Sequence, residues 1–184
     1  CGGTLAELTD KIDEAVLARY FGEIWQPTTK KFKYSGLKLV DEINKLQPRS
    51  VVDLGCGYNE FKKQIPNLIG VDPYNKNADI QVPILEYRPE QKFDVVIVLG
   101  SINFGSTTKI FAELEHSVSL CTQGGTMFFR VNPGLKHEPP ESEWISFYPW
   151  DANFITNCAD YFGVQMLDMR NDTKGRIYFA WRRS

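Results

Sequence analysis

Val51-Val52-Asp53-Leu54-Gly55-Cys56-Gly57-Tyr58-Asn59 is an apolar run that ends on a carboxylate and then breaks into two glycines. A short apolar run bounded by turn residues is typical of a buried β-strand. Glycine has no Cβ, so the backbone of such a turn can approach a nucleotide-like ligand closely. The stretch therefore predicts a strand and a ligand-binding turn, and it is the reference point for the remaining elements.

Similar apolar runs recur along the chain. The run from Phe93 to Gly100 is apolar on both faces, which is expected at the centre of a covered parallel sheet. The last two runs are joined through Asn171–Gly175 and predict a hairpin. Seven strands are expected in all: Ser50–Leu54, Leu68–Asp72, Asp79–Leu85, Phe93–Gly100, Thr126–Val131, Val164–Asp168 and Arg176–Trp181.

Apolar residues at three- and four-residue spacing predict helices between these strands. The segment Thr28–Ser35, with three lysines among aromatics, is interpreted as a solvated linker in preference to a basic lip over a site. Strands and helices alternate, which indicates an α/β fold with a doubly wound, mostly parallel sheet. The helices are expected at Thr4–Ile24, Leu37–Leu46, Glu60–Ile65, Thr107–Cys121 (ended by Gly124 and Gly125) and Asp151–Phe162.

Composition and charge limit the classes of protein to consider. A chain of 184 residues, 42% of them hydrophobic, suits one domain better than two. The formal net charge of -2 does not support nucleic-acid binding through the global field, although nucleic acid stays possible as a partner. No apolar run approaches the roughly 20 residues that span a bilayer. The four cysteines form no C-x-x-C pair, so we expect no metal site, reduced thiols and a cytoplasmic location.

With these elements in place, the chain resembles the class I S-adenosylmethionine-dependent methyltransferases. In that family the first strand ends in an acid followed by Gly-x-Gly, as at Asp53 to Gly57, and the second ends in an acid, as at Asp72. The fourth strand often reads Phe-Asp-Val-Val, as it does from Phe93. The resemblance covers roughly Leu37 to the C-terminus. It implies a seven-stranded sheet with an antiparallel C-terminal strand, formed by residues 36–184, and an N-terminal helix and linker, residues 1–35, that cap the site.

The resemblance also implies a cofactor and the residues that bind it. S-adenosylmethionine would be the methyl donor and S-adenosylhomocysteine the product. Independently of the family, a carboxylate such as that of Asp72 can accept two hydrogen bonds from the ribose diol, and backbone N–H groups of a glycine turn can approach the amino-acid end of the cofactor. The expected cofactor-binding residues are Asp53, Gly55, Cys56, Gly57, Tyr58, Asp72, Pro73, Gly100 and Ser101.

The acceptor is not specified. The sequence after the fourth strand is Gly100 to Phe104, without the Pro-Pro-Tyr signature of amino-methylating nucleic-acid enzymes, and Asn59 replaces a small residue of the glycine motif. The long, proline-rich segment Asn132–Pro149 is interpreted as a functional loop. Asn132 and His137 in it are the candidate catalytic residues, His137 because its reference pKa lies near neutrality.

Two functions stay open on the sequence. The first is transfer of a methyl group, in line, to a small molecule, a protein or a nucleic acid. The second is a catalytically silent Rossmann-like module that serves as a binding or structural part of an assembly.

Overall fold

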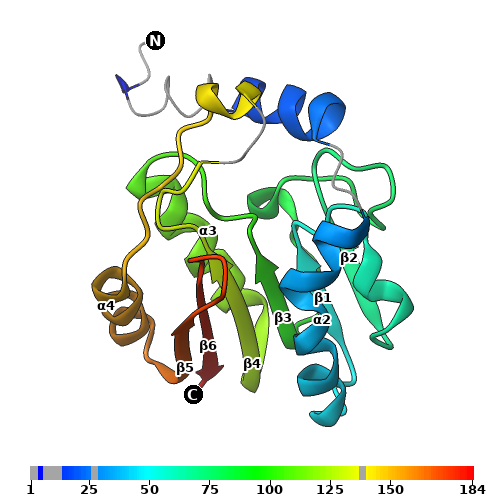
Figure 1. The fold of residues 1–184 in the computed structure, drawn as a ribbon. Helices are drawn as coiled ribbons and strands as arrows, with labels where there is room; N and C mark the ends of the chain where they lie inside the picture. Colours follow the sequence, from blue (N-terminus) through cyan, green and yellow to red (C-terminus); the bar gives the residue numbers. More distant parts are fainter. Residues whose placement is uncertain (1–3, 6–13, 26–28, 137–139) are drawn as a thin grey trace.

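The fold is built on one mixed β-sheet (Figure 1). A computed structural model describes residues 4–5, 14–25, 29–136 and 140–184, and it places side chains for all of these except 29–35, 37, 140 and 141. The strands lie in the order β2-β1-β3-β4-β6-β5. Pairing is parallel from β2 through β4, whereas β6 is antiparallel to both of its neighbours. The strands are β1 (Val51–Leu54), β2 (Leu68–Val71), β3 (Phe93–Leu99), β4 (Cys121–Val131), β5 (Val164–Asn171) and β6 (Ile177–Arg183).

Helices cover both faces of this sheet, as expected for a doubly wound α/β fold. Helix α2 (Thr29–Lys45) lies on one face, and α3 (Thr107–Leu120) and α4 (Ala152–Phe162) lie on the other (Figure 1). Residues 14–19 are helical and continue into the π-helical turn η1 (Tyr20–Ile24) above the sheet edge. Three 3-10 turns complete the elements: η2 (Glu60–Lys63), η3 (Ile84–Glu86) and η4 (Pro140–Trp144).

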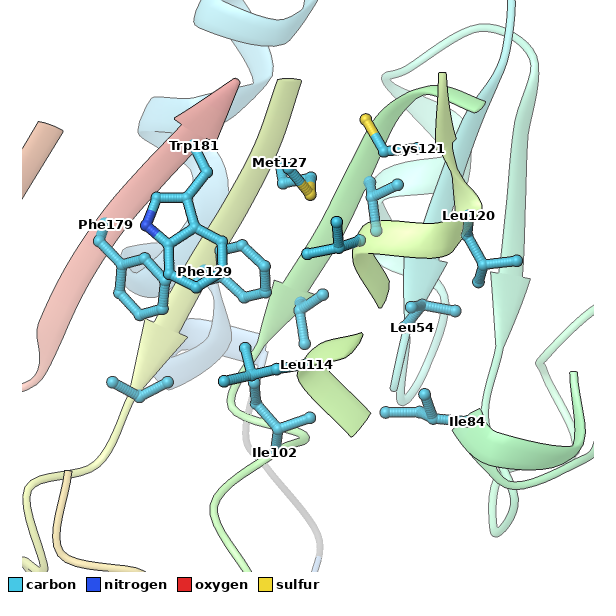
Figure 2. Close-up of a cluster of buried hydrophobic side chains, with 14 of the residues drawn as sticks. Leu54, Ile84, Ile102, Leu114, Leu120, Cys121, Met127, Phe129, Phe179 and Trp181 are labelled. Carbon is cyan, nitrogen blue, oxygen red and sulfur yellow. The ribbon is translucent and has the colours of Figure 1, made fainter. Parts of the chain in front are cut away.

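The two-residue period of the strands divides the core into two layers. Val52 and Leu54 of β1 pack under α3 and α4, whereas Val51 packs under α2. The larger layer contains stacked aromatic rings: Phe129 and Phe179 lie 4.6 Å apart between centroids, with Trp181 beside them (Figure 2). This layer packs against the parallel strands below their carboxyl ends.

The termini of α3 and α4 follow the predicted capping chemistry. The Ser106 hydroxyl accepts the N–H of Lys109, and the Asp151 carboxylate accepts that of Phe154 at 2.8 Å. Gly163 ends α4 in the left-handed conformation, at φ 63°. Both helix starts, and the end of α4, are therefore confirmed.

The prediction of seven strands is wrong by one. Among the described residues the segment Asp79–Leu85 forms an isolated parallel bridge between Ile80 and Val71 and then the 3-10 turn η3. Pro83 explains the difference, because proline has no N–H to donate to a ladder. The sheet therefore has six strands, and β2 lies at its edge.

Two helix boundaries also differ from the prediction. The expected linker Thr28–Ser35 is helical from Thr29 onward and forms the first turns of α2. The glycine in this helix, Gly36, is buried against Phe61, whose ring would lie 2.1 Å from an added Cβ. The helix propensity of the lysines and the tertiary contact at Gly36 together account for this extension.

The glycine pair Gly124-Gly125 lies within a strand and does not end α3. Helix α3 stops at Leu120, and β4 starts at Cys121 and runs through both glycines. An added Cβ on Gly125 would lie 2.7 Å from the Cys121 sulfur and 2.9 Å from the Asp94 carbonyl oxygen. Gly125 therefore allows β4 to pass close to β3, where the pairing register shifts.

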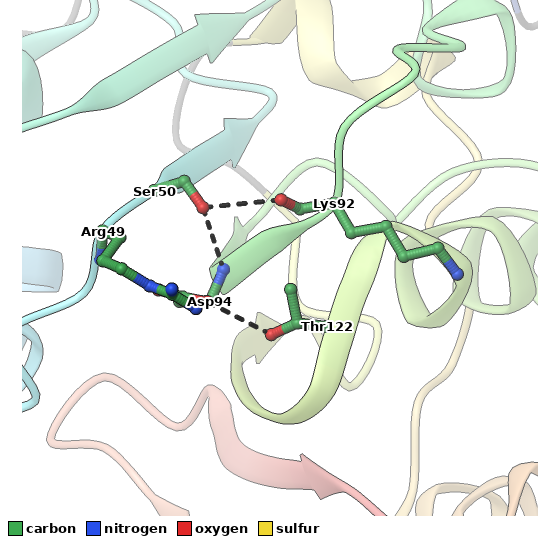
Figure 3. Close-up of polar contacts among 5 residues, drawn as sticks. All are labelled: Arg49, Ser50, Lys92, Asp94 and Thr122. Atoms are coloured by element: carbon green, nitrogen blue, oxygen red, sulfur yellow. Dashed lines mark hydrogen bonds and ion pairs between the residues drawn. The ribbon is translucent and has the colours of Figure 1, made fainter.

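A polar network fastens the amino ends of the strands (Figure 3). The Asp94 carboxylate accepts the backbone N–H of Arg49 at 2.9 Å and the Thr122 hydroxyl at 3.4 Å. Ser50 donates to the Lys92 carbonyl and accepts the N–H of Asp94. The backbone hydrogen bond from Arg49 is the main cause that holds the pKa of Asp94 below its usual value. The network joins β1, β3 and β4 at the edge opposite the glycine turn.

Candidate functional site

Four loops converge at the carboxyl edge of the parallel strands. Asp53 of β1 is in register with Gly70 of β2 and Ile97 of β3, so the glycine turn, the segment after β2 and the segment after β3 are neighbours. The loop after β4 joins them from the other side of β3. Ligands of open α/β sheets bind at this edge.

Asp72, directly after β2, organises the glycine turn. Its Oδ2 accepts the backbone N–H of Gly57 at 3.0 Å, and its Oδ1 accepts those of Tyr74 at 2.8 Å and Asn75 at 2.9 Å. An ionised carboxylate offers about four acceptor positions, so roughly one stays open to a ligand hydroxyl. Asp72 therefore holds two segments together and keeps limited capacity for a diol.

Asp53 is the opposite case, a buried carboxylate without a hydrogen-bond partner among the described residues. It is 3% exposed, and burial raises its pKa from 3.8 to about 7, with repulsion from Asp72 as the second cause. An unpaired carboxylate at such a depth is costly unless it is neutral or meets a cation. The site is therefore matched to a positively charged ligand group.

The N–H groups of the glycine turn are already engaged. Gly55 and Cys56 both donate to the Val71 carbonyl, at 2.7 and 3.0 Å, and Asn59 donates to Cys56. Gly57 donates to Asp72. The turn uses these four N–H groups internally, so the amino-acid end of a cofactor would compete with existing bonds, and its binding by these groups stays a prediction. A donor group such as an ammonium fits this turn better than a carboxylate does.

Gly55 is required by the loop after β3. Its φ is +83°, and an added Cβ would lie 2.1 Å from the Cβ of Ser101. The Ser101 hydroxyl donates to the Leu54 carbonyl at 2.6 Å. Gly100 also has a positive φ, +86°, but an added Cβ there would meet only the Asn103 side chain, at 3.9 Å. The predicted residues Gly55 and Ser101 thus form one contact between two loops, and Gly100 directly precedes Ser101.

Asn132 has a structural role that the sequence did not predict. Its side chain is fully buried; Oδ1 accepts the N–H groups of Gly134 and Leu135, and Nδ2 donates to the Leu135 carbonyl at 2.6 Å. Its own N–H donates to Oδ1 of Asn103, at 2.8 Å. The side chain of Asn132 thus holds the loop after β4 in place, and its catalytic role stays a prediction.

Comparison with known proteins identifies the fold. No protein-family model and no curated protein matches the sequence. Solved structures do match. The 1,6-didemethyltoxoflavin-N1-methyltransferase of Burkholderia thailandensis, solved with that compound and S-adenosylhomocysteine, superposes with a TM-score of 0.71 at 12% identity, over 100% of this chain and 92% of the other.

Magnesium protoporphyrin IX methyltransferase of Synechocystis PCC 6803, solved with S-adenosylmethionine, gives a TM-score of 0.65 at 15% identity, over 94% of this chain and 97% of the other. An N-methyltransferase of Bradyrhizobium japonicum WM9, solved with S-adenosylhomocysteine, gives a TM-score of 0.61 at 11% identity, over 95% of this chain and 98% of the other. This chain has the class I methyltransferase fold. The resemblance seen in the sequence is confirmed at that level.

Within the methyltransferase fold, an aromatic cap lies over the carboxyl edge. Phe21 stacks on Tyr74 at 6.2 Å between ring centroids and meets Phe104 edge-on at 5.5 Å. Trp25 stacks on Tyr58 of the glycine turn at 6.1 Å. The expected capping role of the N-terminal segment thus has a physical basis for residues 14–25, because their rings contact the loops after β1, β2 and β3.

The remaining predicted residues have varied surroundings. Cys56 is buried, and burial raises the pKa of its thiol far above the ordinary value, which fits a filler and not a nucleophile. Tyr58 and Pro73 are half-buried beside the turn. His137 lies outside the described residues. No group of three His, Cys, Asp or Glu side chains suited to a metal occurs in the part of the chain that the structure describes.

The roles of two further residues of this edge were not predicted from the sequence. Asn59 adopts the left-handed conformation at φ 57° and donates to the Asn77 carbonyl and to Asp79, which joins the turn to the segment after β2. An added Cβ on Gly70 would lie 2.2 Å from the Asn59 side chain. Asn103 bridges the loops after β3 and β4. An asparagine after Gly-x-Gly was the available signal for Asn59, since asparagine tolerates left-handed backbone.

Proposed function

We propose that this protein is an S-adenosylmethionine-dependent methyltransferase. The observation that carries the proposal is the unpaired, buried carboxylate of Asp53 beside a turn whose N–H groups are internally bonded. S-adenosylmethionine carries an ammonium and a sulfonium, so a cationic ligand would compensate this carboxylate. The solved neighbours with bound S-adenosylmethionine or S-adenosylhomocysteine support the same assignment.

The residues of the chain would divide the binding work. Asp53 would balance the positive charge of the cofactor's methionine end, and the remaining acceptor position of Asp72 would take a ribose hydroxyl. Gly55, Gly57, Gly100 and Ser101 would shape the floor of the site, with Cys56, Tyr58 and Pro73 as its walls. The aromatic cap formed by Phe21 and Trp25 would exclude water, which favours an in-line displacement.

The chemical step needs no protein nucleophile. The acceptor's lone pair forms a bond to the methyl carbon while the carbon–sulfur bond breaks, and its electron pair stays on sulfur to give S-adenosylhomocysteine. An acceptor that begins protonated gives its proton to a base, for which His137 is the proposed residue. A His137→Ala variant that retained full turnover would remove this residue from the mechanism.

The acceptor we favour is a small molecule. One solved neighbour contains bound 1,6-didemethyltoxoflavin, and another is named for magnesium protoporphyrin IX, both small molecules.

The described cysteines Cys56, Cys121 and Cys158 carry free thiols, which supports a reducing compartment such as the cytoplasm. No helix in the described part of the chain has the length and apolar character needed to cross a bilayer.

Calorimetry with S-adenosylmethionine and S-adenosylhomocysteine tests the proposal. We expect both to bind the wild-type chain, and Asp72→Ala to weaken binding at least tenfold. Asp160→Ala, an exposed acid on α4, is the matched control and should bind normally. Absence of binding by a folded wild-type chain would refute the enzyme and favour the alternative, a silent Rossmann-like binding module.

A further inference from the structure

Three charged side chains meet at the carboxyl edge of the sheet, on the side away from the glycine turn. Arg130 is the second-last residue of β4, Asp172 directly follows β5 and Arg176 directly precedes β6. Val131 and Asn171 are both in register with Ile177, so the three residues lie on adjacent strand ends. The hairpin turn that contains two of them therefore projects from the same edge as the candidate site.

The single carboxylate of this group is already saturated by its neighbours. Oδ2 of Asp172 accepts from Nε of Arg130 at 2.7 Å and lies 2.6 Å from its Nη2. Oδ1 accepts the backbone N–H groups of Lys174 and Arg176 at 2.8 and 2.9 Å. Burial alone would raise the pKa of Asp172, but these hydrogen bonds hold it below its ordinary value. Asp172 is thus an anion committed to Arg130 and to the turn.

The charge of Arg176 is only partly compensated by the carboxylate of Asp172. The Arg176 side chain is half-buried, and its guanidinium makes no hydrogen bond or ion pair within the described ranges of the chain. Burial first, and repulsion from Arg130 second, lower the pKa of Arg176, and the attraction of Asp172 offsets them only in part. Two guanidinium groups therefore share one carboxylate, and the planar fork of Arg176 is available to an external anion.

The position of Arg176 separates it from the predicted cofactor site. Strand spacing is about 4.8 Å, and β3 and β4 lie between β1 and β6, so Arg176 is about 14 Å across the sheet from the glycine turn and about 10 Å from the end of β3. The turn also touches the loop after β4, because an added Cβ on Gly175 would lie 3.2 Å from Leu135. An anion here would belong to a second ligand beside the cofactor.

We propose that Arg176 binds an anionic group of the methyl acceptor, which is then a small molecule carrying a carboxylate or a phosphate within about 10 Å of its methylated atom. This inference rests on the proposed methyl transfer. Arg130 and Asp172 are positioning residues: their ion pair, and the hydrogen bond that the Asp172 carboxylate accepts from the Arg176 backbone N–H, fix the start of β6. The fork of Arg176 then orients the acceptor toward the end of β3.

Arginine Nε–H signals in NMR spectra of the full chain test this directly. Inorganic phosphate and benzoate are titrated separately, at constant ionic strength, with and without S-adenosylhomocysteine. We expect the Arg176 signal, and the neighbouring Arg130 signal, to shift saturably with one of the two probes. In variants of Arg176, the affinity for the probe is measured from the Arg130 signal. This affinity should fall at least fivefold in Arg176→Gln. It should fall less in Arg176→Lys, which keeps the positive charge but loses the planar guanidinium.

Lys174→Gln is the matched control, since Lys174 is an exposed cation in the same turn and should leave the affinity unchanged. Preference for benzoate over phosphate identifies a carboxylate acceptor, and the reverse identifies a phosphate. Unsaturable shifts, equal affinity in Arg176→Gln, or competition between the probe and S-adenosylhomocysteine would overturn the subsite. Saturable binding at Arg176 in a chain that does not bind S-adenosylhomocysteine would instead overturn the methyltransferase proposal and leave the anion site supported.

Discussion

Asp53 lies within β1 and Asp72 directly follows the neighbouring parallel strand β2, yet of these two carboxylates only that of Asp72 accepts backbone hydrogen bonds from the described residues. Three backbone N–H groups donate to Asp72, whereas burial first and repulsion from Asp72 second raise the pKa of Asp53. The two acids thus lie on neighbouring strands in different surroundings. This difference gives the site its preference for a cation and leads to the first two predictions.

Stability should depend on pH through Asp53. Its folded pKa of about 7 lies above the unfolded value of 3.8, so the folded state holds the proton more tightly, and stability falls as pH rises from about 4 to 7. At 1.36 kcal/mol per pKa unit, the loss is at most about 4 kcal/mol. Asp53→Asn should remove this pH dependence of stability, because the amide does not titrate. Urea unfolding at pH 5 and pH 8 measures the difference, with the exposed Asp160→Asn as control; equal pH dependence of the Asp53 variant and the wild type would contradict the assignment.

Cofactor binding should release protons from the same carboxylate. A pKa of about 7 leaves Asp53 partly protonated at neutral pH, and a nearby cation lowers that pKa. We therefore expect a fraction of a proton to be released per S-adenosylmethionine bound at pH 7, and less with S-adenosylhomocysteine, which lacks the sulfonium charge. Calorimetry in buffers of low and high ionisation enthalpy measures the release. The same release by Asp53→Asn would exclude this carboxylate as the source.

The contact between Gly55 and Ser101 predicts unequal costs for two alanine substitutions. Both Gly55 and Gly100 have φ above +80°, a conformation that costs a non-glycine residue roughly 1–2 kcal/mol. Gly100→Ala should cost about that much. Gly55→Ala should cost more, because its Cβ would lie 2.1 Å from that of Ser101. Chemical denaturation of the two variants, and of Gly55→Ala with Ser101→Gly, gives the comparison; the double variant should recover the excess, and failure to do so would show that the clash is not its cause.

Burial of the Asn132 side chain predicts a loss of stability on substitution. Asn132→Ala would remove the acceptor of the Gly134 and Leu135 N–H groups and the donor to the Leu135 carbonyl; because both residues are exposed and water can replace part of these bonds, we expect a cost of about 0.5–1.5 kcal/mol for each bond. Asn132→Asp keeps the acceptor but buries a charge and loses the donor to Leu135, so it should cost at least as much. Thermal unfolding distinguishes the two. A variant of native stability with lost turnover would support the catalytic hypothesis for Asn132.

Much of the fold could be predicted from the sequence, because the spacing of apolar residues and the capping residues of helices are both visible in short stretches of sequence. The start of α4 at Asp151, its end at Gly163 and the all-apolar β3 each followed from a few adjacent residues. Apart from the strand that Pro83 interrupts, the errors arose where distant residues decide the structure. Gly125 lies within β4, close to the Asp94 carbonyl oxygen, and does not end a helix as its local sequence suggested. Gly36 packs against the ring of Phe61 inside α2, in a helix that begins earlier than its local sequence suggested.

The site could be located but not described from the sequence. Strand ends identified Asp53 and Asp72, since parallel strands bring their carboxyl ends to one edge. Their different hydrogen bonding could not be foreseen, because it depends on the path of the segment from Tyr74 to Asn75. Arg176 was visible only as the start of a strand. Its guanidinium has no side-chain partner in the described part of the chain because the carboxylate of Asp172 is bonded to Arg130. Arg130 lies 46 positions earlier in the sequence, so this arrangement cannot be inferred from local sequence.

The stacking of Trp25 on Tyr58 predicts how the aromatic cap affects cofactor exchange. An aromatic pair contributes about 0.5–1.5 kcal/mol beyond its buried area, which corresponds to a factor of about 2 to 13 in an equilibrium or rate constant. Trp25→Ala should therefore speed S-adenosylhomocysteine dissociation within this range, because the ring that joins the cap to the glycine turn is lost. Stopped-flow displacement measures the rate. Tyr161→Ala, at an exposed ring of α4 that packs on Phe111, is the control for a general loss of aromatic packing. If both variants release the ligand at the wild-type rate, the cap does not limit exchange, and the stacked rings only support the fold.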